Sequence, residues 1–400
     1  MMIKEKLSPD KVLLLLYVVL KPFYFFPSGN PQIADFIMLI LIGYSFLFRL
    51  GRINRRLGLF LFLTLLFLYD IMMVNGIWTI ALGGEMDIFS STKWYMYNGA
   101  VMLALVILFR RNPQEYVKWV FLATSTSLLI QAFILVSGLS PDSDEFRQSL
   151  FFNNPNQLGY FGLLCMGICL LCARFVSVKT LPLFIAIGTA FSIIAASLSK
   201  AAIISAVGMY LVFLLLSIKE RTGLFWMNLL CVLVSSFTVF FIYLYTNENV
   251  LSDASIYTQI EERMVSLGED SDDNLAARGY DRIANHPEYI LFGAGEGMYD
   301  RFNSSISLEL HSTLANLFFS YGVMGTVLFI LMIYGAVRGH RLVAWYPLVF
   351  QILYGLTHNG IRETFFWIML ALYFVTAEIN TRQIKNGGDL LEKNLASMRN

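Results

Sequence analysis

A histidine, a glutamate and several arginines stand outside the apolar runs of this chain, where ionisable side chains can do chemistry. Arg278 and Arg282 are four residues apart, so both face the same side of a predicted helix. Glu309 and His311 follow, where the chain turns apolar again. Guanidinium groups stabilise negative charge on phosphate oxygens, and a histidine with an ordinary pKa of about 6.5 can act as a general base. These residues predict a site for an anionic substrate and a proton acceptor.

Other ionisable residues lie at or near the ends of apolar runs. Lys200 follows a very apolar run and precedes another, and Arg362 lies in the last polar turn. A charge at bilayer depth is costly unless it is paired or hydrated, which makes both residues functional candidates. A hairpin lysine also snorkels to lipid headgroups, which is the alternative for Lys200. Glu363 is the expected partner of Arg362, with Asp35 and Asp70 as further acids.

The elements that position these residues are membrane helices. Hydrophobic residues make up 57% of the chain and charged residues only 14%, which excludes an ordinary soluble protein. A bilayer core of about 30 Å needs roughly 20 apolar residues per helix. We therefore expect a single all-α polytopic membrane domain over residues 1–400, with about twelve transmembrane helices. The predicted spans are 11–27, 32–49, 57–75, 92–109, 118–138, 158–176, 181–197, 201–217, 224–246, 311–337, 342–357 and 363–380.

The distribution of lysine and arginine predicts the orientation. Alternate connections are basic, which by the positive-inside rule places them and both termini in the cytoplasm. Residues 381–400 then form a cytoplasmic tail. The longest connection, 247–310, becomes a large outer loop between the ninth and tenth helices. The glycines at 293, 295 and 297 predict a sharp turn in it, since no strand precedes them as a nucleotide-binding motif requires.

Neither the cysteines nor the acids predict a metal centre. The four cysteines all fall in apolar runs, where cysteine behaves as a small hydrophobic residue. We expect no disulfide, no metal site and no cofactor.

The chain resembles the O-antigen polymerase and O-antigen ligase superfamily. His311-Ser312, followed after nine residues by Gly322 and after two more by Gly325, is similar to that family's His-(Asn/Ser/Gln)-x9-Gly-x-x-Gly signature. The stretches NNPNQLG (153–159), SLSKAA (197–202), R-x3-R with FGAGEG (278–297) and ELHS (309–312) resemble it in the same order. The resemblance covers about 140–365. The family more often has Arg at the place of Lys200, and lysine lacks the bidentate fork of arginine.

This resemblance implies a GT-C-type glycosyltransferase that uses undecaprenyl-pyrophosphate-linked oligosaccharide at the periplasmic face of the bacterial inner membrane. A Wzy-type polymerase joins lipid-linked repeat units, whereas a WaaL-type ligase transfers the glycan to lipid A-core. ELHS, FGAGEG and the following Arg301 look more like a polymerase. The expected partners are the lipid-linked glycan, the bilayer and a chain-length regulator protein, without nucleic acid.

Glycosyl transfer from a pyrophosphate assigns a role to each residue. Charge builds on the departing phosphate oxygen, and positioned guanidinium groups stabilise it without a metal. His311 is the expected general base with Glu309 orienting it, in a single displacement that inverts the anomeric carbon. The expected pyrophosphate ligands are Arg278, Arg282, Lys200 and Arg147, and further substrate-binding candidates are Asn156, Arg301 and Arg362. A twelve-helix transporter or flippase is the less favoured alternative, since the two halves of the chain look dissimilar.

Overall fold

The computed structural model describes residues 8–27, 29–141, 147–218, 229, 233, 278–304 and 307–379, and the regular elements in this part are all helical. The α-helices are α1 (Pro9–Leu20), α2 (Ile33–Tyr44), α3 (Arg55–Ala81), α4 (Met86–Ser90), α5 (Thr92–Phe109), α6 (Pro113–Ser137), α7 (Pro155–Phe175), α8 (Thr180–Ser197), α9 (Lys200–Ile218), α13 (Asp281–Asn285), α14 (Thr313–Val337), α15 (Tyr346–Tyr354) and a last helix, Thr364–Ile379. Short turns are η1 (Ser45–Arg49), η3 (Pro287–Tyr289), η4 (Tyr299–Phe302) and η5 (Leu342–Trp345).

Seven helical segments in the described part are long and apolar enough to cross a membrane. They contain the predicted spans 57–75, 92–109, 118–138, 158–176, 181–197, 201–217 and 311–337, give or take a few residues at the ends. The other predicted spans are not confirmed at full length. The span 224–246, apart from residues 229 and 233, and the tail 381–400 lie outside the described residues, as does the part of the outer loop before residue 278.

Four predicted spans coincide with helices that are shorter than a full crossing. The span 11–27 ends early, because α1 stops at Leu20 and Pro22 cannot continue a helix. The span 32–49 divides into α2 and the π-helical turn η1. The spans 342–357 and 363–380 correspond to η5 with α15 and to the last helix. A hydropathy window joins such pieces, since it reads composition and not hydrogen bonding.

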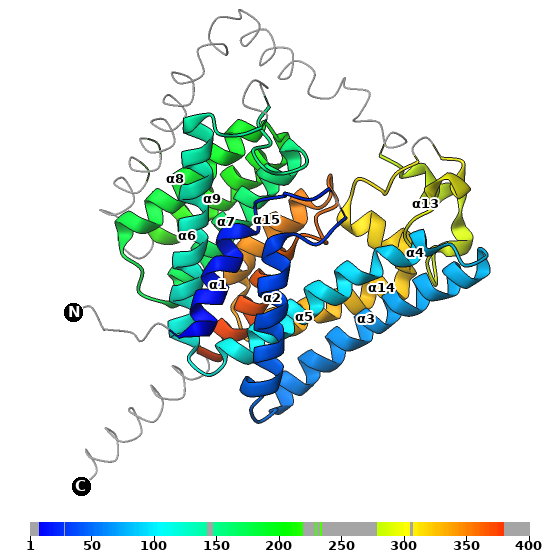
Figure 1. The fold of residues 1–400 in the computed structure, drawn as a ribbon, viewed down its shortest axis with the longest axis horizontal. Helices are drawn as coiled ribbons and strands as arrows, with labels where there is room; N and C mark the ends of the chain where they lie inside the picture. Colours follow the sequence, from blue (N-terminus) through cyan, green and yellow to red (C-terminus); the bar gives the residue numbers. More distant parts are fainter. Residues whose placement is uncertain are drawn as a thin grey trace, which may run out of the picture.

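The helices form two groups that meet at the middle of the molecule (Figure 1). In one group α3 packs lengthwise against α14 and α5; in the other α7 packs against α6, α8 and α9. Between them, α1 contacts α2 and α6, and α15 contacts α7 and α9. The segment containing α13 lies over the end of α3 and α14, beside α4 (Figure 1).

One end of the bundle gathers basic side chains. Arg56 donates to the carbonyl of Arg338 at 2.8 Å, and Arg110 forms an ion pair with Glu378 at 3.0 Å. At the same end Lys11 pairs with Glu115. These contacts bring the starts of α1, α3 and α6 together with the ends of α5, α14 and the last helix. We call this the basic end; the positive-inside rule predicts that it faces the cytoplasm.

Cysteine labelling tests this orientation. Glu85→Cys, in the exposed turn before α4, should react with a membrane-impermeant maleimide on spheroplasts, because that turn is predicted to lie outside. Gln114→Cys, an exposed position at the basic end, should react only after permeabilisation. Both changes are made after replacing the four native cysteines with alanine. The reverse labelling pattern would mean that the orientation is inverted.

The helix α14 is broken at Gly322, whose φ of 65° and ψ of −168° are not helical. In a continuous helix the carbonyls of Phe319 and Ser320 would accept from the N–H groups four residues later. Here they accept instead from Ala294 at 2.9 Å and Gly295 at 2.8 Å. Non-helical backbone inside a membrane bundle must be satisfied by other protein groups. The glycine-rich segment therefore supplies the hydrogen bonds that the break removes.

This contact requires glycine on both sides. A Cβ at Gly322 would lie 2.3 Å from the Leu291 carbonyl oxygen, and one at Gly293 would lie 2.3 Å from that of Ser320. Both residues also have positive φ, as do Gly295 and Gly297. The predicted sharp turn is confirmed, and its function in the fold is to dock backbone against backbone.

The docked segment is also held by α3 and α5. Trp78 of α3 donates its ring N–H to the Gly293 carbonyl at 3.0 Å, and Asn75 accepts from the Glu296 N–H at 3.0 Å. Tyr95 of α5 donates to the buried Glu296 carboxylate at 2.5 Å, and Asn316 donates to it at 3.0 Å. The start of α14 is thereby fixed relative to α3 and α5.

Candidate functional site

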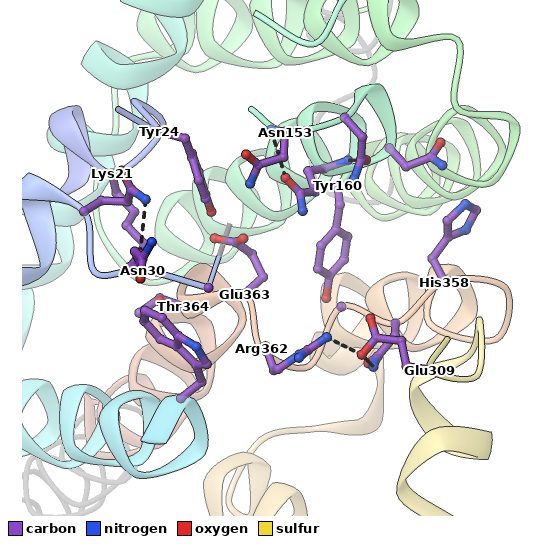
Figure 2. A pocket seen from close by; sticks show the side chains of 18 of the residues that line it. Lys21, Tyr24, Asn30, Asn153, Tyr160, Glu309, His358, Arg362, Glu363 and Thr364 are labelled. Atoms are coloured by element: carbon purple, nitrogen blue, oxygen red, sulfur yellow. Dashed lines mark hydrogen bonds and ion pairs between the residues drawn. The ribbon is translucent and has the colours of Figure 1, made fainter. Parts of the chain in front are cut away.

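A cavity of about 440 Å³ lies at the end of the bundle opposite the basic end. Each of α5, α7 and α14 begins at this cavity and runs to the basic end. The other walls are the α1–α2 loop and the segment between α15 and the last helix (Figures 1 and 2). Its size falls in the range of roughly 300–1,000 Å³ typical of ligand sites.

Four predicted site residues line the cavity, namely Asn156, Glu309, His311 and Arg362. Two of them, Glu309 and His311, stand just before the N-terminal cap of α14, which is Ser312. The Ser312 hydroxyl accepts from the Ala315 N–H at 3.3 Å, which begins the helix, and it donates to the Gly355 carbonyl at 3.2 Å. The His311 side chain, immediately before the cap, is exposed to the cavity. The His-Ser pair therefore combines a helix start with a reactive side chain.

Glu309 and Arg362 form an ion pair on the cavity wall (Figure 2). Their side chains are 28% and 35% exposed, so a ligand can reach both. Asn359 also donates to the Glu309 carboxylate at 3.2 Å, and Asn98 of α5 holds the Arg362 carbonyl at 2.8 Å. Burial raises the pKa of Glu309, although Arg362 acts in the opposite direction. The expected partner of Arg362, Glu363, does not form this pair.

The segment after α15 is fixed to the start of α14. Thr313 donates its N–H to the Gly355 carbonyl at 2.7 Å and its hydroxyl to the His358 carbonyl at 3.1 Å. The ring of His358 stacks on Tyr354 at 4.9 Å, and Tyr354 stacks on Tyr160 at 4.4 Å. Burial, together with the charges of Arg278, His311 and Arg147, lowers the pKa of His358 to about 4. This histidine is therefore neutral at physiological pH.

Acid should destabilise the protein through His358. Because the folded pKa of about 4 lies below the unfolded value of about 6.5, the unfolded state binds the proton first. Stability is expected to fall as the pH drops from about 6.5 to about 4 and to be insensitive to this group above pH 7. The melting temperature, measured from pH 7.5 to 4.5, should drop less in His358→Gln than in the wild type. Equal drops would show that His358 is protonated as easily in the folded state.

Arg147 and Arg278 do not line the cavity themselves, but each contacts a residue that does. Arg147 donates to the Asn156 side-chain oxygen at 3.0 Å and to the Ser197 carbonyl at 3.3 Å. Arg278 donates to the Thr357 carbonyl at 3.4 Å, and its own carbonyl accepts from the His311 N–H at 3.2 Å. The structure thus brings together two arginines and two histidines from segments far apart in the sequence.

The remaining three predicted residues, Lys200, Arg282 and Arg301, do not line the cavity either. Lys200 is half-buried at the start of α9, in the hairpin that packs on Gly159 of α7. Arg282 is fully buried; it donates to Ser304 at 2.6 Å and lies over the ring of Tyr299 at 5.1 Å. Arg301 donates to the Ala294 carbonyl and lies 4.4 Å from the ring of Phe302. In this structure Arg282 and Arg301 hold the described segment 278–304 together.

The cavity also contains residues that the sequence did not assign to the site. Lys21 forms a buried ion pair with Asp35 at 2.6 Å, joining the end of α1 to the start of α2. Glu363 lies near Tyr24, and Figure 2 shows its carboxyl group directed away from Arg362. The polar run Thr-His-Asn-Gly-Ile-Arg-Glu between two apolar runs was the available signal for His358 and Glu363.

The donor set of the cavity suits an anion better than a metal. Within the described residues, no cluster of three or more histidine, cysteine or acidic side chains is placed to hold a metal ion. His311, His358 and Arg362 line the cavity, and Arg147 and Arg278 lie beside it; all five side chains can donate hydrogen bonds to negatively charged oxygens.

Comparisons of the chain with protein-family models, with curated proteins and with solved structures found no match. The function must therefore be inferred from the chemistry of the cavity and from its position in the bundle.

Proposed function

We propose that this protein is a glycosyltransferase that joins polyprenyl-pyrophosphate-linked sugar units at the outer face of a bacterial inner membrane, as an O-antigen or related polysaccharide polymerase. The observation that carries the proposal is a polar cavity lined by His311 and Arg362, with Arg147 and Arg278 in contact with residues of its wall. The resemblance of the His311–Gly325 stretch to the polymerase and ligase superfamily supports it.

In the proposed reaction the arginines bind the leaving group. The acceptor oxygen attacks the anomeric carbon, the bond from that carbon to the phosphate oxygen breaks, and the pyrophosphate leaves with both electrons. Arg278 and Arg147 stabilise the charge that builds on this oxygen, as preorganised donors do in a partly dehydrated site. The sugar–pyrophosphate bond is already activated, so the reaction needs no nucleotide.

The acceptor hydroxyl must lose a proton as it attacks. His311 receives this proton at a ring nitrogen, since its side chain is exposed to the cavity while its backbone is fixed by the Ser312 cap. Glu309 was expected to orient His311, and its contacts suggest a different role. Its contacts are with Arg362 and Asn359, so we assign it to positioning Arg362 in the cavity.

Complementation of a deletion strain tests the function. Lipopolysaccharide from the null strain should show core with a single repeat unit, and wild type should restore the ladder. His311→Ala should not, because loss of a general base typically costs about 10²–10⁴ in rate. His286→Ala is the matched control, since the His286 side chain contacts Glu288 and does not line the cavity.

Other outcomes identify the alternatives. Absence of all glycan on the core, with lipid-linked polymer accumulating, would make the protein the ligase. An unchanged ladder in the null strain would mean that the protein does not polymerise O-antigen. That result would favour a transporter or flippase, or a different glycan.

A further inference from the structure

The cavity has two chemically different ends. His311 and His358 line one of them, and Arg147 and Arg278 lie beside it, in contact with Asn156 and His311. The other is bounded by the α1–α2 loop and by the start of α7, and its side chains are amides and aromatic rings. The following paragraphs concern this second part, which we call the amide end and define by Tyr24, Asn30, Trp94, Asn153 and Gln157.

The loop that forms this wall is preorganised. The Gln32 side chain accepts from the Phe26 N–H at 3.0 Å and donates to the Phe26 carbonyl at 3.0 Å, which closes the loop on itself. Asp35 accepts from the Gln32 N–H at 2.8 Å and from Lys21 at 2.6 Å. Tyr24 donates its N–H to the Phe151 carbonyl at 3.2 Å. The wall therefore keeps its shape without a ligand.

The amides that face the cavity keep hydrogen-bonding capacity. Gln157 lines the cavity and uses its side-chain oxygen to accept from the Asn153 N–H at 3.2 Å, and an amide of this kind still has an NH₂ group that donates. Asn30 and Asn153 are exposed there, and within the described contacts neither side chain makes a hydrogen bond. An amide both donates and accepts, as a sugar hydroxyl does. The rings of Tyr24 and Trp94 add flat apolar surface for a sugar face.

The charges at the amide end nearly cancel. Lys21 is paired with Asp35, and the remaining ionisable group is the carboxyl of Glu363. The nearest arginine on the wall, Arg362, is paired with Glu309. A carboxylate on a bound sugar would thus meet another acid and no spare cation, which is an unfavourable arrangement. An uncharged ring meets only donors, acceptors and aromatic faces.

We propose that the amide end binds sugar rings of the lipid-linked glycan and selects neutral or N-acetylated sugars over uronic acids. This inference rests on the proposed function, because it places the sugars beside the pyrophosphate site. It adds the class of sugar and the residues that select it, Asn30, Asn153 and Tyr24.

Ligand-observed NMR on the purified full chain tests the proposal. The protein is kept in a detergent without a sugar headgroup, and saturation transfer is measured to N,N′-diacetylchitobiose and to digalacturonate at equal concentration. The neutral disaccharide should give the stronger signal. Replacing Asn30 and Asn153 together with alanine should weaken its binding about tenfold, the loss expected for one or two hydrogen bonds. Gln114→Ala, an exposed amide at the basic end, should bind as wild type does.

A second probe separates this inference from the proposed function. Line broadening of the ³¹P signal of inorganic pyrophosphate should persist in the double alanine variant and disappear in Arg278→Ala. Diacetylchitobiose binding that is absent, or unchanged in the double variant, would overturn the sugar site while pyrophosphate binding stood. Digalacturonate binding as strongly as the neutral disaccharide would overturn the selectivity. Failure of pyrophosphate to bind in an Arg278-dependent way would count against the proposed function itself.

Discussion

The Gly322→Ala variant is expected to lose most of its folded protein, whereas Gly138→Ala should remain folded. The two glycines have nearly the same φ but differ in ψ. Gly138 is in the left-handed helical region at 64° and 20°, whereas Gly322, at 65° and −168°, is in a region essentially restricted to glycine. The alanine at 322 is therefore the more strained of the two. The positions also differ in the space around them. A Cβ at Gly138 meets nothing within 4 Å, but at Gly322 it lies 2.3 Å from the Leu291 carbonyl oxygen. Overpacking typically adds about 1–3 kcal/mol, and here it also separates backbone hydrogen bonds.

Thermal unfolding in detergent, followed by size-exclusion chromatography, measures this difference. Gly322→Ala should show a much lower melting temperature and a smaller monodisperse peak than Gly138→Ala. Equal losses in the two variants would mean that neither the glycine-only backbone conformation nor the close contact at Gly322 matters for stability. The docking of the segment 290–295 in the break of α14 would then be wrong.

Arg278→Ala and Arg282→Ala should fail in different ways, although the sequence assigned both to the same pyrophosphate. Arg278 lies beside the cavity, so its removal should lower glycan transfer by about 10²–10³ without changing the melting temperature. Arg282 is buried against Tyr299 and Phe302 and donates to Ser304. Its removal should lower the melting temperature, because it leaves a hole among aromatic rings.

The measurements are transfer activity per folded molecule and the melting temperature of each variant. Arg282→Lys serves as a control that keeps the charge and loses the planar stacking group. It should remain destabilised, whereas Arg278→Lys should recover part of the activity. If Arg282→Ala were inactive yet fully stable, Arg282 would be a substrate ligand as the sequence suggested.

The long helices were predictable because an apolar run of this length has one satisfactory structure in lipid. Six predicted spans between 57 and 217 and the span 311–337 lie in long helices for this reason. The short helices were predicted less well. Pro22 was available as a stop signal for the first span, but its apolar neighbours masked it in a hydropathy reading. The break at Gly322 depends on a partner segment that sequence spacing does not place.

The sequence predicted which residues belong to the site better than it predicted which of them contact one another. His311 and Arg362 lie on the cavity wall because both stand at helix starts on one end of the bundle. Which acid pairs with Arg362 is a tertiary question, and the neighbour in sequence, Glu363, turns away from it (Figure 2). The helical spacing of Arg278 and Arg282 assumed a longer helix than the five residues of α13, which begins only at Asp281.

The break in α14 also sets an order of events during biogenesis. Thr313–Val337 is a stretch of 25 mostly apolar residues, and the insertion machinery recognises such a stretch as one uninterrupted span. Residues 290–295 leave the ribosome first, yet they have no docking place until this span exists. We therefore expect the helix to enter the membrane straight and to exchange its own hydrogen bonds for those of the waiting segment afterwards. Since His311 stands at the start of this helix, we expect the cavity wall that carries it to reach its final shape only after this docking.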